Sequence, residues 1–371
     1  MAALRVWTAE GLPGDPGAWL YTVAHNQMLG DLRKQGGRSR ILENAADGFD
    51  GGGIPPATAH FSGEVKDDML RMLFICCNET IPRESQLVLA LKTLCGFSTA
   101  EIGFRLFATE ANVHKRLARA RERLSEGSAE LQTPPLETLG NRLSGVLDVL
   151  YLLFNEGYLS SHPEQAVRNE LCEEAIRLTA LLAEHPVGAR SETFALLALM
   201  HLHTARLPGR MDGAGGLLLL EEQDRSLWDE GRIRIGLEWL ARGAVGETFS
   251  RFHAEAGIAA EHCLAPSFGE TRWKEIVDLY AMLERISPSP LHTLNKAVAM
   301  AEWQGAEAGL SVLEGLLPTS RMSGFYLWEA VFSDLNRRAG NIEIARQHQV
   351  KALESAPTEA LRALLRRRLD L

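Results

Sequence analysis

Six polar residues of types that commonly contact nucleic acids lie close together in the sequence, between residues 112 and 123. Cations bind phosphates, while polar groups on a helix in the major groove hydrogen-bond to base edges. Glu110 and Val113 belong to the same stretch and are further candidates for base contacts. We predict that this segment binds DNA, although a charge run can also be the solvated face of an amphipathic helix. The six predicted residues are Asn112, His114, Lys115, Arg116, Arg119 and Arg123.

The sequence around these residues predicts a helix, a tight turn and a second helix within residues 96–124. Ser98 or Thr99 can cap the first helix, and Glu101 stands where the acidic partner of a capping box belongs. Thr109 follows a short break and is suited to cap the second helix. Such a helix-turn-helix places its basic second helix in the major groove. The buried face of that helix would consist of Val113, Leu117, Ala120 and Leu124.

A helix predicted over residues 18–34 carries a second set of polar residues. Asp15 followed by Pro16 is a helix-start signal, because proline suits the first helical position. An aromatic ring beside amides and cations suits the stacking of single-stranded bases. A tryptophan near a helix start is also common in protein cores. Taken alone, this set therefore does not distinguish a contact with single-stranded bases from a core position. The side chains concerned are Trp19, His25, Asn26, Arg33 and Lys34.

The charge is distributed unevenly along the chain. Its 371 residues suffice for two or three domains with a large core. Residues 1–128 hold 15 Lys and Arg against 15 Asp and Glu, so the formal net charge of −9 comes from the remainder, with 24 basic and 33 acidic residues. This asymmetry indicates a division of labour between a neutral part with a basic helix and an acidic part.

Targeting and cofactor signals are absent from the sequence. No apolar run is long enough to span a bilayer, and the N-terminus lacks a signal peptide. The cysteines are odd in number and lack C-x-x-C spacing, which is typical of small buried residues in a reducing cytoplasm. We therefore predict a cytoplasmic protein with no membrane partner, no metal and no cofactor. The cysteines are Cys76, Cys77, Cys95, Cys172 and Cys263.

Two segments with the composition of linkers divide the chain. Residues 36–63 are rich in Gly, Ala and Pro, and residues 125–137 include Pro134 and Pro135. Beyond the second linker, helical patterns broken by glycine and proline predict stacked helical hairpins and an all-α fold. The last part looks like a tetratricopeptide unit, with a looser copy at residues 294–317. The positions that carry this likeness are Gly340, Ala345, Ala352 and Pro357.

Residues of the C-terminal part that could do chemistry do not form a catalytic set. His201 and His203 stand two apart, so on a helix they point to different faces and do not match the metal-binding pair of H-E-x-x-H. The glycine run at residues 213–216 lacks the lysine and hydroxyl residue of a phosphate-binding loop. We therefore predict that the chain is not an enzyme. A solvated acidic face would consist of Glu221, Glu222, Asp224 and Asp229.

Together these segments resemble the extracytoplasmic-function sigma factors of the sigma-70 family. Within that family they look like the subgroup with a C-terminal tetratricopeptide-like extension. Residues 16–33 are similar to the promoter-melting helix of sigma domain two, and residues 67–77 and 94–124 are similar to domain four. Stretches that resemble the extension lie at residues 149–158, 220–229 and 287–299.

The resemblance implies a partial sigma domain two at 1–35, a linker at 36–63, domain four at 64–126 and the extension at 138–371. The set around Trp19 would hold the melted strand of the minus-ten element, and the six residues at 112–123 would read the minus-thirty-five element. Core RNA polymerase and promoter DNA would be the partners, with no covalent chemistry in the chain itself. Domain two of the family begins with further helices, so the resemblance also implies either an upstream start or an N-terminally shortened form.

The resemblance makes the extension a regulatory or docking module for a protein or a small ligand. Its negative charge could cover the basic helix until a signal displaces it. The alternative function is a helical-repeat adaptor that binds a protein or a small ligand and carries a vestigial DNA-binding part.

Overall fold

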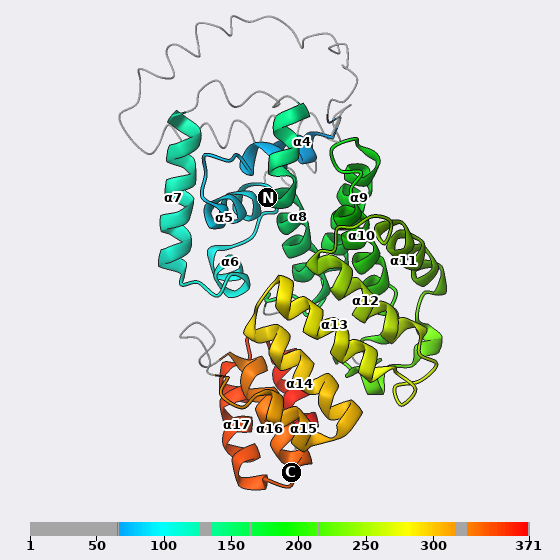
Figure 1. Cartoon of the computed structure of the whole chain (residues 1–371). Coiled ribbons are helices and arrows are strands. Elements are labelled where there is room, and N and C mark those ends of the chain that lie inside the picture. The colour runs from blue at the N-terminus through cyan, green and yellow to red at the C-terminus, as the bar shows by residue number, and fades with distance from the viewer. Residues whose placement is uncertain are drawn as a thin grey trace, which may run out of the picture. The chain divides into compact units, whose positions relative to one another are not determined.

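The computed structural model describes residues 65, 67–126, 136–162, 165–213, 216–316 and 325–369 (Figure 1). Helices and their connections make up these ranges, and the predicted all-α fold is confirmed. Extended residues pair within the described ranges only at an isolated bridge between Met211 and Leu217. None of the described helices is both long and apolar enough to cross a bilayer. The helix predicted over residues 18–34 and the linker predicted over residues 36–63 lie outside the described residues.

The chain divides into two compact units, Met1–Asp68 and Met69–Leu371, and the described helices belong to the second unit apart from Asp68 itself. Four of the described helices, α4 to α7, bury Phe74, Val88 and Ile102. The last of the four packs against the two helices before it (Figure 1). The four are α4 (Asp68–Cys76), α5 (Arg83–Thr93), α6 (Thr99–Arg105) and α7 (Glu110–Glu126).

A long helix, α8 (Leu136–Tyr158), packs against both α5 and α9. Glycines permit its close contacts: a Cβ at Gly145 would lie 2.9 Å from Cβ of Cys77, and one at Gly157 would lie 2.6 Å from the backbone nitrogen of Cys172. The helices that follow α8 pack as successive antiparallel neighbours. They are α9 (Asn169–Glu184), α10 (Ser191–Thr204), α11 (Glu230–Gly243), α12 (Arg251–Leu264) and α13 (Trp273–Ile286), with short 3-10 helices η1 (Leu207–Gly209), η2 (Leu220–Glu222) and η3 (Arg225–Leu227) before α11.

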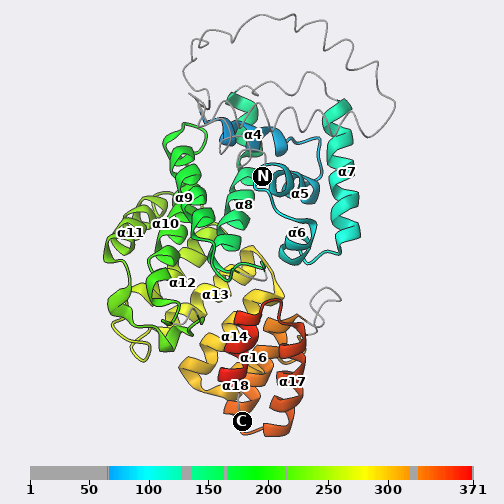
Figure 2. The same ribbon diagram turned by 180° about the vertical axis from the view of Figure 1, so that it is seen from behind.

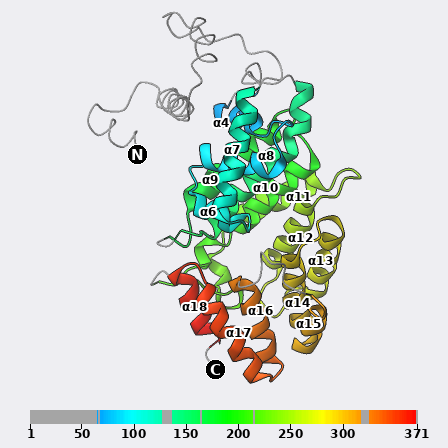
Figure 3. The ribbon, with the colours of Figure 1, turned by 90° about the vertical axis from the view of Figure 1, so that its left-hand side faces the viewer.

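The C-terminal helices form two hairpins and a final helix. α12, α13, α14 and α15 lie beside one another in sequence order (Figure 3), and α16 packs against α17 and α18 (Figure 2). Gly305 and Gly340 occupy the two hairpin turns with φ values of +97° and +82°, a region that favours glycine. Ala345 and Ala352 are buried. The helices are α14 (Pro290–Gln304), α15 (Ala306–Val312), α16 (Tyr326–Arg338), α17 (Ile342–Ser355) and α18 (Glu359–Leu369).

Candidate DNA-binding interface

The caps predicted for the helix-turn-helix are present in the structure. The Ser98 hydroxyl accepts a hydrogen bond from the backbone N–H of Glu101 at 3.2 Å, and the Glu101 carboxylate accepts one from the backbone N–H of Ser98 at 2.6 Å. This reciprocal pair is a capping box, and it starts α6 at the predicted place. Thr109 caps α7, because its hydroxyl accepts a hydrogen bond from the backbone N–H of Asn112 at 3.3 Å.

The turn between α6 and α7 is tight because residue 103 is glycine. A Cβ at Gly103 would lie 2.7 Å from the carbonyl oxygen of Ala108, whose own N–H donates to the Gly103 carbonyl at 2.8 Å. Phe107 adopts a φ of +49°, which is uncommon for a residue with a side chain. The Thr99 hydroxyl donates to the Glu110 carboxylate at 2.7 Å. Glu110 therefore ties the first turns of the two helices together.

α7 has a buried apolar face and an exposed polar face, as its spacing predicts. Val113, Leu117 and Ala120 are buried, and Leu124 is half-buried. The predicted DNA-binding residues follow one line along α7 at three- and four-residue spacing, apart from His114 and Arg116. The line consists of half-buried Asn112 and exposed Lys115, Arg119 and Arg123, and the His114 side chain is exposed beside it.

The structure changes the assignment of Arg116. Its side chain is only 6 % exposed, and its guanidinium forms an ion pair with the Glu84 carboxylate of α5. Position 116 follows the buried Val113 by three residues, so the two side chains share the inner side of α7. Arg116 therefore fastens α7 to α5 and is not available to a duplex.

We expect Arg116→Met and Arg119→Met to have different effects. Arg116→Met should lower the free energy of unfolding by about 1 kcal/mol, because it removes a charge-assisted hydrogen bond to an exposed carboxylate. Its affinity for DNA should stay within about threefold of the unmodified chain, whereas Arg119→Met should weaken binding by about tenfold. Fluorescence anisotropy with a labelled duplex separates the two variants, and equal losses of affinity would contradict the assignment of Arg116.

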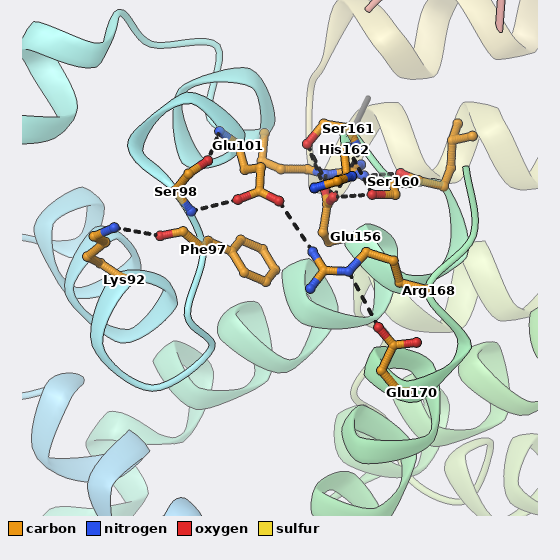
Figure 4. A network of polar contacts seen from close by, with 12 residues as sticks. Lys92, Phe97, Ser98, Glu101, Glu156, Ser160, Ser161, His162, Arg168 and Glu170 are labelled. Atoms are coloured by element: carbon orange, nitrogen blue, oxygen red, sulfur yellow. Dashed lines mark hydrogen bonds and ion pairs between the residues drawn. The ribbon is translucent and has the colours of Figure 1, made fainter. Parts of the chain in front are cut away.

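α6 is fastened to the extension, residues 138–371, through the fully buried carboxylate of Glu156 on α8 (Figure 4). Glu156 accepts hydrogen bonds from Nε of Arg105 at 2.6 Å, from the Ser160 hydroxyl at 2.7 Å and from the Ser161 backbone N–H at 2.9 Å. The Arg105 guanidinium also donates to the Leu159 carbonyl oxygen. Both charges are therefore satisfied away from water, as a buried ion pair requires.

Two further contacts join the helix-turn-helix to the extension. Nη1 of Arg168 donates to the Glu101 carboxylate at 3.3 Å (Figure 4). Burial of this carboxyl opposes ionisation, but the capping hydrogen bonds and the Arg168 charge outweigh it, so the pKa of Glu101 lies below its usual value. The rings of Phe104 and Phe107 lie 5.9 and 5.0 Å from that of Phe325, measured between centroids. The extension thus contacts α6 and the turn.

Sequence reasoning missed this junction. Glu156 carries the one signal that could have found it, since it follows the apolar run at residues 149–154 on the same helix and so must be buried with a partner. Its partner Arg105 lies 51 residues away in sequence, and no local pattern identifies it. The N-terminal set predicted to hold single-stranded bases lies outside the described residues; it consists of Trp19, His25, Asn26, Arg33 and Lys34.

The structure gives the contacts of the C-terminal residues that were considered as catalytic candidates. The four acidic residues at 221–229 are exposed, as a solvated face requires; Glu222 also pairs with Arg367 at 2.8 Å, and the side chain of Asp229 caps α11. His201 and His203 lie on α10, and Nδ1 of each is buried and makes no hydrogen bond to any residue that the structure describes. No group of three His, Cys, Asp or Glu side chains in the described residues is arranged to hold a metal ion.

The buried histidines of the extension predict a loss of stability in mild acid. Burial lowers the pKa of His201 to about 4 and that of His262 to about 3, and it places the pKa of His203 well below 6.5. The unfolded chain then binds more protons than the folded chain below pH 6.5, so the free energy of unfolding should fall as the pH falls from 6.5 towards 4. Each histidine contributes a slope of up to about 1.4 kcal/mol per pH unit.

Urea unfolding between pH 7 and pH 5 measures this slope. His201→Gln should remove part of this slope even if the variant is less stable at every pH. The slope depends on the difference in bound protons between the unfolded and folded chain, and not on the contacts that the side chain makes. A slope that is the same in the variant and in the unmodified chain would contradict the assignment.

Comparisons with known proteins identify two parts of the chain. Residues 71–124, which contain α5, α6 and most of α7, match the family described as sigma-70, region 4. Residues 142–244 match a family of unknown function, DUF6596. A protein of Rhizobium meliloti (strain 1021) named uncharacterized protein R00370 is 34% identical over 369 residues, which cover 99% of this chain and 86% of that protein. No solved structure matches the chain.

Proposed function

We propose that the chain, whose residues 71–124 match sigma-70 region 4, is a sigma factor of the extracytoplasmic-function subgroup that directs core RNA polymerase to promoters. In this proposal residues 64–126 are sigma domain four, and α7 reads the minus-thirty-five element. The reading residues are Asn112, His114, Lys115, Arg119 and Arg123.

One observation carries the proposal: α7 combines an anchored inner side with an exposed outer line of polar and basic side chains. Lys115 and Arg119 lie on that line in the middle of the helix and are exposed. Guanidinium and ammonium groups so placed can reach phosphates and base edges when the helix enters a major groove. The capped and tied first turns hold α6 and α7 in the rigid relation that such an entry needs.

For the rest of the chain the proposal follows the resemblance. Residues 1–35, outside the described part, are assigned to the minus-ten element through Trp19, His25, Asn26, Arg33 and Lys34. Residues 138–371 form a tetratricopeptide-like extension that regulates initiation. Such a protein performs no covalent chemistry, because the polymerase supplies the active site.

We further propose that the extension regulates by holding domain four in place. The contacts that support this idea join α6 and the turn to the extension, while the outer line of α7 stays exposed in the structure. The same contacts would set the position of α7 relative to a polymerase that is bound elsewhere on the chain. A signal received by the extension could then reach α7 through the junction at Glu156.

Two experiments test the function. Selection of duplexes from a random library should enrich one sequence motif, whose affinity falls steeply with salt because the cations of α7 displace counterions from phosphates. Capture of core RNA polymerase by the immobilised chain should be saturable. If no motif is enriched and the polymerase is not captured, while other proteins are captured by the chain, the alternative is favoured. The alternative is a helical-repeat adaptor with a vestigial DNA-binding part.

A further inference from the structure

Glu110 is an exposed carboxylate at the first position of α7, the helix that we propose to read DNA. The sequence also suggests Val113 for base contacts, but its side chain has 0 % exposure and cannot touch a base edge. Glu110 therefore needs an explanation of its own. A negative charge on the DNA-facing end of a helix is repelled by phosphates, so an acidic residue there does not contribute to affinity through the backbone of the duplex.

The position of Glu110 places it near the bases. In a helix-turn-helix complex the N-terminal residues of the second helix contact base edges, while the first helix crosses the backbone. Thr109 caps α7 and Glu110 is the first residue within the helix. A side chain at this end extends into the major groove when the helix enters it.

The Glu110 carboxylate is held in place through one of its two oxygens. The Thr99 hydroxyl donates to Oε2 at 2.7 Å. Thr99 is half-buried at the first position of α6, where the capping box of Ser98 fixes the backbone. Oε1 accepts no hydrogen bond from any group in the described part of the chain, and no described cation pairs with this carboxylate. Glu110 thus presents one free acceptor from a fixed position, as specific recognition requires.

The major groove offers four different partners to such an acceptor. An ionised carboxylate can only accept hydrogen bonds. Guanine presents N7 and O6 and thymine presents O4, all of which are acceptors that repel a carboxylate. Adenine presents its N6 amino group beside the acceptor N7, whereas the polar group of cytosine in this groove is its N4 amino group. Cytosine is therefore the base that fits best.

We propose that Glu110 is a specificity-determining residue of α7, and that its Oε1 accepts a hydrogen bond from the N4 amino group of one cytosine in the recognised element. Thr99 is its positioning residue. The inference rests on the proposed function, because it requires α7 to lie in the major groove. It adds a selection that the cations cannot make, since Lys115 and Arg119 carry donors alone and favour guanine and phosphates.

Fluorescence anisotropy of the full chain tests the inference on the motif selected from random duplexes. At each motif position, four duplexes that differ in one base pair are compared. At one position cytosine should be preferred at least tenfold over the other three bases. Glu110→Gln should change this preference from cytosine to adenine, because an amide pairs with N6 and N7 of adenine. Glu110→Ala should reduce the discrimination at this position to less than threefold.

Two further variants separate base reading from charge and from helix packing. Glu122→Gln removes one negative charge from an exposed residue about three turns further along α7, and it should leave the preferred base unchanged at every position. Thr99→Val keeps the shape of the side chain but removes the hydroxyl that holds Oε2. It should lower the preference for cytosine by about threefold without changing the preferred base.

The inference fails separately from the proposed function. If the unmodified chain selects a motif but Glu110→Gln keeps the same preference at every position, or loses affinity equally for all duplexes, Glu110 only ties α6 to α7 and the inference is overturned. If the unmodified chain selects no motif, promoter recognition and the inference are overturned together.

Discussion

Glu156→Gln should loosen α6 from the extension and lower the free energy of opening of α6 by about 3 kcal/mol. Glutamine keeps the shape of the side chain but removes the charge that the Arg105 guanidinium faces. Arg105 is only 15 % exposed, so its cation would be left in a site that water reaches poorly. Removing one partner of a buried pair is costly for this reason, whereas an exposed pair contributes less than about 1 kcal/mol.

Amide hydrogen exchange measures the effect where it arises. Residues 99–106 should exchange about a hundredfold faster in Glu156→Gln than in the unmodified chain, since this factor corresponds to about 3 kcal/mol. Glu174→Gln is the matched control, because Glu174 pairs with Arg177 at 2.7 Å on an exposed surface. Unchanged exchange of residues 99–106 in Glu156→Gln would show that the buried pair does not hold α6.

The double variant Lys115→Ala/Arg119→Ala should weaken binding to the selected duplex by about thirtyfold or more. Both side chains lie on the exposed line of α7, and each bidentate contact with a base edge contributes about 1–3 kcal/mol. A plot of log affinity against log salt concentration should also become shallower, its slope falling by about one for each phosphate that the variant no longer neutralises.

Arg234→Ala/Lys274→Ala is the control for charge. It removes two exposed cations of the extension, at 71% and 57% side-chain exposure, and so changes the net charge by the same amount. Its affinity for the duplex should stay within about threefold of the unmodified chain. If both double variants lost affinity equally, binding would depend on overall charge and not on α7.

The helix-turn-helix could be predicted because its determinants are local. Ser98, Glu101 and Thr109 act on backbone groups three residues away, so their types and spacing suffice to locate the helix starts. Arg116 shows the limit of this reasoning. The basic run predicts an exposed cation at position 116, although its distance of three residues from Val113 places it on the inner side, where Glu84 neutralises it.

The junction could not be predicted, because its residues come together only through tertiary packing. Glu156 and Arg105 are separated by 51 residues, and Arg168 and Glu101 by 67. A pattern of residue types does not report which of these charged side chains are buried.

Run-off transcription with core RNA polymerase on a template that carries the selected duplex sequence tests the central claim most directly. The unmodified chain should produce a transcript with one start site, Lys115→Ala/Arg119→Ala should reduce it more than tenfold, and Arg234→Ala/Lys274→Ala should leave it unchanged. A transcript of undiminished amount from Lys115→Ala/Arg119→Ala, or no transcript from the unmodified chain, would contradict promoter recognition by α7.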